Sequence, residues 1–271
     1  MPELPEVEIT LRGIQSHILN KKIDEVDIRQ PNLRWKVPVR LIQKNLIGES
    51  FSLIRRRAKY LIFESLTGSL IIHLGMSGSL RILKKLISPQ KHDHIDIIFE
   101  KDCILRYTDP RRFGSFHWTQ DADNHYLLAS LGLEPLGNLF SGEYLFKSSR
   151  RRKVIIKNFI MNSKIVVGIG NIYANEALFL SGIKPQRPAG RVKLEEYQNL
   201  SFAIRKVLKR SIDLGGTTLR DFVDAENRPG NFKQILNVYG REGKNCKVCS
   251  STLKNIKISN RSTYFCSSCQ K

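Results

Sequence analysis

The sequence lacks any apolar run that approaches the length of a membrane-spanning helix, which needs about 18 consecutive apolar residues. This absence excludes an integral membrane protein built from helices. The acidic N-terminus does not resemble a secretory signal peptide. We therefore expect a cytoplasmic protein that works in a reducing compartment and has no membrane partner.

Acidic residues are scarce relative to basic ones. The chain of 271 residues carries 25 Asp and Glu against 45 Lys and Arg, a formal net charge of +20. Such an excess favours a polyanion as the partner, either nucleic acid or an anionic membrane surface. Residues 147–164 contain no acidic residue, and residues 227–271 contain only Glu242. These two stretches predict an extended docking surface, with nucleic acid as the leading partner.

Cysteine is also rare, but four of the five cysteines fall in one pattern near the C-terminus. The pattern Cys246-x2-Cys249-x16-Cys266-x2-Cys269 is typical of two knuckles that close a tetrahedral zinc site with four thiolates. Disulfides are the alternative, which the lack of an export signal disfavours. Four protein ligands leave no open coordination position, so we predict one structural Zn2+. Cys103 is expected to be a small core residue.

Hydrophobic periodicity divides the chain into two halves. Short apolar runs separated by turn residues occur between residues 26 and 118, which predicts an antiparallel β-sandwich or flattened barrel. Helix is expected in this half only over residues 4–18 and after Asn124. Beyond a stretch with Pro and Gly at 133–137, a 3.6-residue period predicts helices over residues 154–160, 172–180 and 194–208.

These patterns predict an α+β protein with four parts. The parts are an N-terminal β-sandwich domain with a leading helix (1–133), an interdomain linker (134–142), a helical domain (143–235) and a zinc-finger β-hairpin (236–271).

The N-terminus carries a candidate nucleophile. If Met1 is removed, the chain begins with Pro2, whose nitrogen is then a secondary amine. The pKa of an α-amino group is ~7.7–8, so a fraction of these amines is unprotonated and nucleophilic at neutral pH. Glu3 and Glu6 would lie beside it at the start of the first helix. The alternative is that these glutamates only complement the helix dipole.

The stretch Pro-Glu-Leu-Pro-Glu-Val-Glu at residues 2–8 resembles the start of the Fpg/Nei family of base-excision repair enzymes. The resemblance implies that Pro2 is the catalytic nucleophile and that Glu3 handles proton transfers at the sugar. It assigns Glu6 a supporting role, in which the carboxylate orients the terminus.

Three stretches of the strand-rich half combine turn residues with polar or charged ones, at residues 55–60, 73–78 and 109–114. The basic run at 55–60 suits phosphate contact, with protection of a strand edge as the alternative. The other two can present side chains that wedge into a base stack, although each is also ordinary turn chemistry.

All three stretches match patterns of the Fpg/Nei family. The resemblance implies that the gap left by an everted nucleotide is filled by Met76, Arg111 and Phe113. It further implies that Lys59 and His73 hold phosphates around that nucleotide, and it counts Lys59 among the catalytic residues. The nearby pair His92 and His94 lacks a spaced third ligand, so we expect ordinary polar side chains there and no metal site.

The helical half contains the glycine-rich turn Val167-Gly168-Ile169-Gly170-Asn171-Ile172-Tyr173. A turn that leads into a helix exposes backbone N–H groups to an anion, so with the basic run before it we predict a helix–two-turn–helix element that binds the DNA backbone. The resemblance implies that Asn171 binds phosphate, that Glu176 supports this element, and that Arg261 on the zinc-finger hairpin contacts phosphate. It makes Arg220, in the polar loop 215–231, a candidate contact to the extruded base.

The activity implied by the resemblance is excision of oxidised purines, such as 8-oxoguanine, from double-stranded DNA by a monomer, followed by β,δ-elimination. Two alternatives stay open. Endonuclease VIII shares the architecture but prefers oxidised pyrimidines, and Leu4, Met76 and Phe113 favour the purine enzyme. A non-catalytic zinc-containing RNA- or DNA-binding protein explains the charge and the cysteines, but gives no reason for the Pro-Glu terminus.

Overall fold

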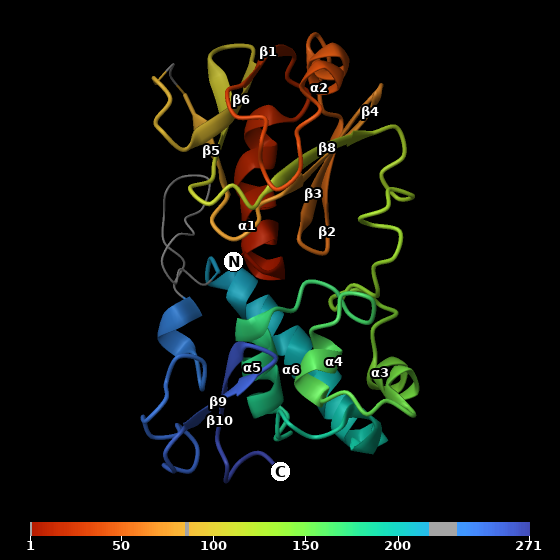
Figure 1. The fold of residues 1–271 in the computed structure, drawn as a ribbon, viewed down its shortest axis with the longest axis vertical. Coiled ribbons are helices and arrows are strands. Elements are labelled where there is room, and N and C mark those ends of the chain that lie inside the picture. Colours follow the sequence, from red (N-terminus) through yellow and green to blue (C-terminus); the bar gives the residue numbers. More distant parts are fainter. Residues whose placement is uncertain (1, 85–86, 217–231) are drawn as a thin grey trace. The chain divides into compact units, whose positions relative to one another are not determined.

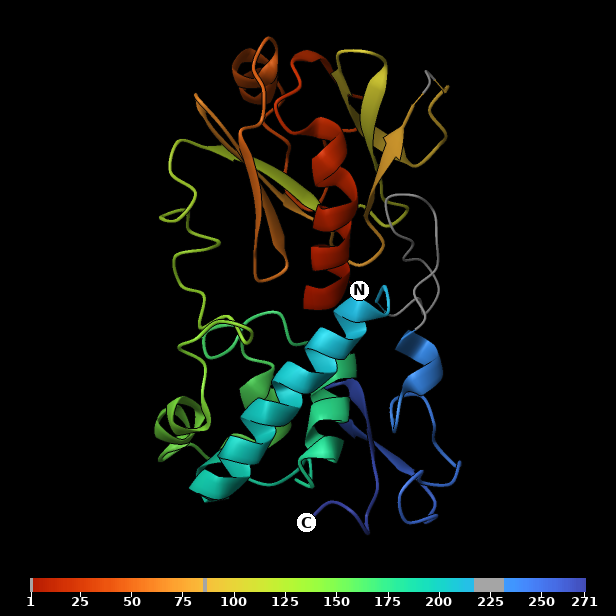
Figure 2. The ribbon, with the colours of Figure 1, turned by 180° about the vertical axis from the view of Figure 1, so that it is seen from behind.

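The computed structural model describes residues 2–84, 87–216 and 232–271 (Figures 1 and 2). The chain divides into two compact units, Met1–Ala129 with Leu214–Lys233, and Ser130–Asp213 with Gln234–Lys271. Each unit is described by itself below.

The first unit contains two four-stranded antiparallel sheets, with strand orders β1-β6-β7-β5 and β2-β3-β4-β8. The apolar residues of these strands are mostly β-branched or aromatic, which suits a pleated and half-buried surface. The strands are β1 (Ile23–Ile28), β2 (Leu53–Arg57), β3 (Tyr60–Ser65), β4 (Gly68–His73), β5 (Ser79–Leu83), β6 (Asp93–Phe99), β7 (Cys103–Thr108) and β8 (Ser115–Thr119).

Helix α1 (Leu4–Ile18) lies between the two sheets and forms the centre of this unit (Figure 2). Pro5 occupies its first turn, where the missing N–H group costs nothing. Its apolar stripe, with Val7 and Ile14, shares one core cluster with Phe63 of β3 and Leu105 of β7. Because α1 is packed from both sides, the residues that precede it are fixed to the core of the unit.

The predicted α+β class with an N-terminal sandwich and a leading helix is confirmed. Two local predictions are corrected. The residues after Asn124 form turns and not a helix, and an unpredicted helix, α2 (Val39–Leu46), follows Pro38. A signal for α2 was present, because Ile42 and Leu46 lie four residues apart and both are buried on one face.

The second unit is helical and ends in a hairpin. The predicted long helix is α6 (Leu194–Asp213), which buries its apolar stripe from Tyr197 to Leu208. The other elements are α3 (Gly142–Ser149), α4 (Ile156–Ile160), α5 (Asn171–Leu180), the short helix η1 (Ala189–Arg191), and the hairpin strands β9 (Lys254–Ile258) and β10 (Arg261–Phe265). The short helix η2 (Phe232–Ile235) contains residues of both units.

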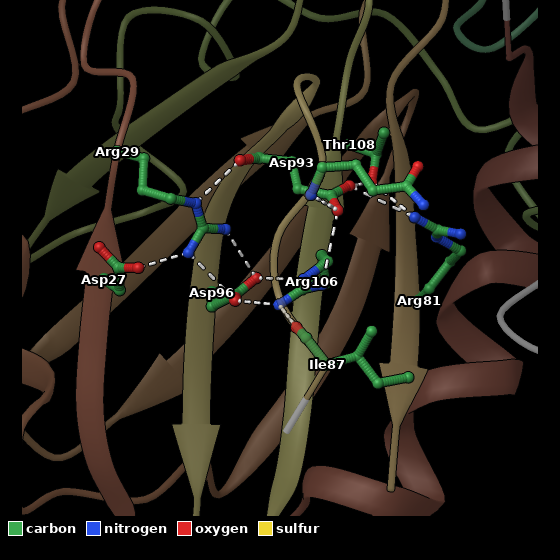
Figure 3. Close-up of polar contacts among 9 residues, drawn as sticks. Asp27, Arg29, Arg81, Ile87, Asp93, Asp96, Arg106 and Thr108 are labelled. Atoms are coloured by element: carbon green, nitrogen blue, oxygen red, sulfur yellow. Dashed lines mark hydrogen bonds and ion pairs between the residues drawn. The ribbon is translucent and has the colours of Figure 1, made fainter. Parts of the chain in front are cut away.

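A buried ionic layer joins neighbouring strands of the β1-β6-β7-β5 sheet (Figure 3). Arg106 of β7 contacts Asp96 at 2.7 Å and Asp93 at 3.4 Å, and all three side chains are at most 5% exposed. Arg29 contacts Asp96 at 3.0 Å from the other side. Burial alone would raise the pKa of Asp93, but hydrogen bonds from Thr108 and the Gln90 N–H outweigh it and lower that pKa.

We expect Arg106→Met to destabilise the protein by about 3–5 kcal/mol at neutral pH, because it leaves two buried carboxylates without their central cation. The lowered pKa of Asp93 means that its contribution is present at neutral pH and lost as pH falls through the folded-state value. The difference in unfolding free energy between Arg106→Met and the wild type should therefore be smaller in acid than at neutral pH. Urea unfolding at neutral and at acidic pH measures this difference. Arg12→Met, which breaks the exposed Arg12–Glu8 pair, is the control and should cost less than about 0.5 kcal/mol. Equal losses in the two variants would contradict the prediction.

Candidate functional site

The start of α1 holds two buried carboxylates next to Pro2. Pro2 is buried, and Glu3 and Glu6 are 3% and 2% exposed. The backbone N–H of Glu3 donates to Glu6 Oε2 at 2.8 Å. Glu6 therefore holds the turn that carries Pro2 and Glu3 at the first residues of the helix.

The segment after α6 returns to this end of the first unit. A Cβ built on Gly216 would lie 3.4 Å from Glu6 Oε1, and its φ of +81° requires the freedom of glycine. The Phe232 N–H donates to the Gly216 carbonyl at 3.0 Å. The two residues that flank 217–231 are thus joined near Glu6. Arg220 lies outside the described residues.

The turn between β2 and β3 brings Lys59 close to His73. Ala58 and Lys59 form this turn, with Ala58 at φ +56°, and Tyr60 of β3 pairs with His73 of β4. Burial lowers the pKa of His73 to about 4, and the charges of Lys59 and Arg34 add to the effect. His73 is therefore neutral near pH 7.

The hydrogen bond of His73 fixes its tautomer. Its Nδ1 accepts the Gly75 N–H at 3.0 Å, so the proton of the neutral ring is on Nε2. The ring can then donate from Nε2 to an anion such as a phosphate oxygen. Because the ring stays neutral above about pH 5, this donor does not change over the physiological range.

Met76, Arg111 and Phe113 lie on two loops that are in direct contact. A Cβ built on Gly75 would lie 2.3 Å from the carbonyl carbon of Phe113, so the two backbones touch. The Arg111 guanidinium lies 4.8 Å from the centre of the Phe113 ring. Met76 and Phe113 are 38% and 42% exposed, unusual for large apolar side chains. The structure therefore brings these three residues together at the surface.

In the second unit, Asn171 of α5 is hydrogen-bonded to the backbone of strand β10, which begins at Arg261. Asn171 Nδ2 donates to the Ser262 carbonyl at 3.0 Å, and the Tyr264 N–H donates to Asn175 Oδ1 at 2.8 Å. The side-chain amides of Asn171 and Asn175, one turn apart on α5, therefore hydrogen-bond to the backbone at the edge of the hairpin. The second N–H of the Asn171 amide can donate to an anion in front of the helix N-terminus.

Arg261 begins β10 directly after the hairpin turn. Ser259 and Asn260 have φ of +47° and +59°, and Arg261 pairs with Ile258, as in a two-residue hairpin with positive φ at both central positions. Asn158 of α4 donates to Ser259 Oγ at 2.7 Å and fixes this turn to the helices. Arg261 is exposed.

The four C-terminal cysteines form a cluster that fits zinc. Their sulfur atoms all lie within 4.8 Å of one another, with Cys246–Cys269 at 3.9 Å and Cys249–Cys266 at 3.4 Å. A tetrahedral site with Zn–S bonds of about 2.3 Å needs S–S edges of about 3.8 Å. The cysteines are not paired in disulfides in the part of the chain that the structure describes. The cluster is positioned to bind one zinc ion.

Glu176 attaches the segment before the zinc cluster to α5. Its buried carboxylate accepts four hydrogen bonds at 2.9 Å each, from the backbone N–H groups of Asn237, Val238 and Tyr239 and from Asn237 Nδ2. These donors satisfy a charge that would otherwise be costly to bury. Glu176 therefore positions the chain that enters the zinc finger.

Sequence reasoning missed several residues of these sites. Asn175 and Ser262, which join α5 to the hairpin, gave no signal beyond the spacing of Asn171 and Asn175. Arg34, whose charge acts on His73, stands in a loop with no motif.

The matches to known families cover most of the chain. Residues 1–116 match the formamidopyrimidine-DNA glycosylase N-terminal domain, residues 131–223 the H2TH domain of the same enzymes, and residues 243–271 a zinc finger found in FPG and IleRS.

Individual relatives are similar over the full length. The chain is 51% identical to a formamidopyrimidine-DNA glycosylase of Methylococcus capsulatus and 53% identical to one of Cellvibrio japonicus, with 100% of both chains covered in each case. Among solved structures, Lactococcus lactis Fpg in complex with DNA containing an abasic site has a TM-score of 0.91 and 32% identity, with 99% of each chain covered. The same enzyme bound to DNA containing N7-benzyl-Fapy-dG has a TM-score of 0.92 at 32% identity, with 100% of both chains covered. No helix in the described ranges is long and apolar enough to cross a membrane.

Proposed function

This chain belongs to the formamidopyrimidine-DNA glycosylase family, and on that premise we propose that it excises oxidised purines from double-stranded DNA and then cleaves the strand at the abasic site. The observation that carries the proposal is the Pro2–Glu3 terminus, buried at the start of a helix and held there by Glu6. Relatives that match along their whole length are named for the same glycosylase activity.

The proposed reaction begins at the Pro2 nitrogen. Its lone pair attacks C1′ of the everted nucleotide and displaces the damaged base, which takes up a proton as it leaves. The attached nitrogen loses its proton, and the C1′–O4′ bond then breaks as the ring oxygen takes up a proton. The product of this ring opening is an iminium ion between the nitrogen and C1′, because a secondary amine that condenses at this carbon retains no N–H to lose. The cation is an electron sink that acidifies the C2′ hydrogen, so successive β- and δ-elimination release the 3′ and 5′ phosphates. Glu3 would protonate the sugar ring oxygen and later accept protons.

The loops of the first unit would hold the everted nucleotide. Met76, Arg111 and Phe113 would fill the position that the base leaves, as exposed apolar and cationic side chains do in other DNA-bending proteins. The Nε2–H donor of His73 and the ammonium of Lys59 would contact the flanking phosphates. In this proposal the catalytic domain is residues 1–133.

The second unit would bind the DNA backbone. We assign phosphate contacts to Asn171 and Arg261. The two residues are linked through the backbone, because Asn171 donates a hydrogen bond to the carbonyl of Ser262, which follows Arg261 in the chain. The zinc ion would hold the hairpin that carries Arg261 and take no part in the chemistry. In this proposal the linker is residues 134–142, the helical domain 143–235 and the zinc finger 236–271.

A trapping experiment tests this function. The protein is incubated with duplexes containing 8-oxoguanine or thymine glycol in the presence of borohydride, which reduces the iminium to a stable adduct. We expect an adduct on both an abasic control and the 8-oxoguanine duplex, with peptide mass analysis locating it at Pro2. Faster processing of thymine glycol would favour the endonuclease VIII alternative, and the absence of any adduct would leave only the non-catalytic one.

We expect Arg261→Ala to weaken binding to all duplexes alike and to reduce the slope of log K against log salt by about 0.9, the value for one lost phosphate contact. Fluorescence anisotropy between low and moderate salt measures the slope. Lys44→Ala removes an exposed cation of α2, outside the proposed surface, and serves as the charge-matched control. An unchanged slope for Arg261→Ala would remove Arg261 from the interface.

A further inference from the structure

The side chain of Asp109 lies behind the two loops that carry Met76, Arg111 and Phe113. It is completely buried and accepts four hydrogen bonds. Its Oδ1 accepts from Ser77 Oγ at 2.6 Å and from the Arg111 N–H at 3.2 Å. Its Oδ2 accepts from Tyr107 Oη and from the Gly114 N–H, both at 2.9 Å. All four partners are donors, which suits an ionised carboxylate.

These four donors belong to three different segments. Ser77 is on the loop of residues 74–78, called the Met76 loop. Arg111 and Gly114 are on the loop of residues 109–114, called the Arg111–Phe113 loop, and Tyr107 is on strand β7. Asp109 and Ser77 are 32 residues apart in the sequence. One carboxylate therefore joins both exposed loops to each other and to the sheet.

The packing around the carboxylate leaves no room for adjustment. A Cβ on Gly114 would lie 1.7 Å from Tyr107 Oη, and one on Gly78 would lie 2.8 Å from the same atom. Burial raises the pKa of the Tyr107 phenol, and the charge of Asp109 raises it further, so the phenol remains a donor.

The backbone of Asp109 is held separately. Its carbonyl contacts His94 Nε2 at 2.8 Å, and its N–H donates to the His92 carbonyl at 3.0 Å. His94 of β6 and His92, just before β6, thus hold the main chain of Asp109. The carboxylate is available to accept hydrogen bonds from the two loops.

We propose that Asp109 is a positioning residue that holds the Met76 loop and the Arg111–Phe113 loop in one fixed arrangement, so that the three exposed side chains enter the base stack as a unit. The inference rests on the proposed function and deepens it. Because Asp109 is completely buried, its carboxylate is not available for direct contact with DNA. It acts through the placement of the side chains that replace the everted nucleotide, and a displacement of about 1 Å in such groups can cost up to a hundredfold in rate.

The first test is Asp109→Asn in the full-length protein. The amide keeps the shape but has one oxygen, so its NH2 group must face either the Arg111 N–H or the Gly114 N–H, which cannot turn away. Two rates are compared: excision of 8-oxoguanine from a duplex, and cleavage of an abasic site in single-stranded DNA, which has no base stack to enter. We expect the ratio of duplex to single-strand rate to fall by on the order of tenfold or more.

Asp121→Asn is the matched control. Asp121 is exposed, belongs to the same unit, and accepts hydrogen bonds within its own loop, from the backbone and side chain of Asn124. Asp121→Asn therefore removes the same charge at a distance in sequence from both loops. Its ratio should equal that of the wild type. A ratio for Asp109→Asn within about twofold of wild type, with both rates lowered alike, would show a merely structural role and overturn the inference.

Ser77→Ala provides a second variant, which removes the hydroxyl that donates to Asp109 Oδ1 and accepts the Arg111 N–H at 3.3 Å. If Ser77 acts through Met76, Ser77→Ala should slow duplex excision in the wild type but have no further effect in a Met76→Ala background. If Ser77→Ala slows duplex excision by the same factor in the wild-type and Met76→Ala backgrounds, the inference is overturned. This cycle decides the question even if Asp109→Asn does not fold.

Amide hydrogen exchange separates failure of the inference from failure of the proposed function. Asp109→Asn should accelerate exchange at the Arg111 and Gly114 amides by on the order of tenfold or more, whatever reaction the protein catalyses. A wild-type protein that neither excises nor traps would refute the proposed function alone. Unchanged exchange at both amides would refute the positioning role alone.

Discussion

Adding a Gly-Ser extension ahead of Pro2 is expected to lower formation of the borohydride adduct by on the order of a thousandfold or more. Acylation turns the secondary amine into a tertiary amide, whose nitrogen lone pair is delocalised into the carbonyl group and is no longer nucleophilic. The extension removes the proposed nucleophile and leaves the residues proposed to bind phosphate in place. Single-turnover trapping on abasic duplex DNA measures the effect.

Duplex binding should change by less than about threefold in the same protein, because phosphate contacts dominate affinity and the residues proposed to make them lie elsewhere in the chain. The same dipeptide added after Lys271 is the control and should leave the trapping rate near that of the wild type. Intact mass analysis must show which N-terminus is present in each sample. An extended protein that forms the adduct at the normal rate would exclude the Pro2 nitrogen as the nucleophile.

Replacing Cys266 by Ser is expected to reduce the zinc content from one ion per chain to none and to weaken duplex binding by on the order of a hundredfold. In the part of the chain that the structure describes, the local core cluster has five buried residues, of which Cys246 and Cys266 are two, so the hairpin has little apolar surface to hold it without the metal. Loss of the hairpin removes Arg261 and also the Ser262 carbonyl that holds Asn171. Elemental analysis and anisotropy measure the two effects.

Cys103→Ala is the matched control for this experiment. Cys103 is a buried cysteine of the first unit, and its thiol donates a weak hydrogen bond to the His17 carbonyl at 3.6 Å. Burial raises the pKa of its thiol, so it is a poor metal ligand and a poor nucleophile. This variant should keep its zinc and its DNA affinity. A Cys266→Ser protein that keeps one zinc ion would contradict the four-thiolate site.

The features that could be predicted were those encoded by local spacing. The four-cysteine pattern indicated a zinc site, because the residues within each pair are only three positions apart and the chemistry of the ligands is specific. The periodicity of α6 identified that helix directly, and the short apolar runs between residues 26 and 118 identified the strand-rich half. Helix α2 was missed because it is only 8 residues long and lies within the half in which the apolar runs predicted strands.

The sequence by itself determined the family resemblance, the thiolate ligands and the Pro-Glu terminus, since each is a property of residues near one another in the chain. Only the tertiary structure decided that Asp109 joins two exposed loops, that Arg106 lies between two buried carboxylates, and that Asn171 is held by Ser262, 91 residues away. The physical reason is that a buried polar group must find its partners wherever the fold places them, and a single sequence carries no record of which distant donor meets which acceptor.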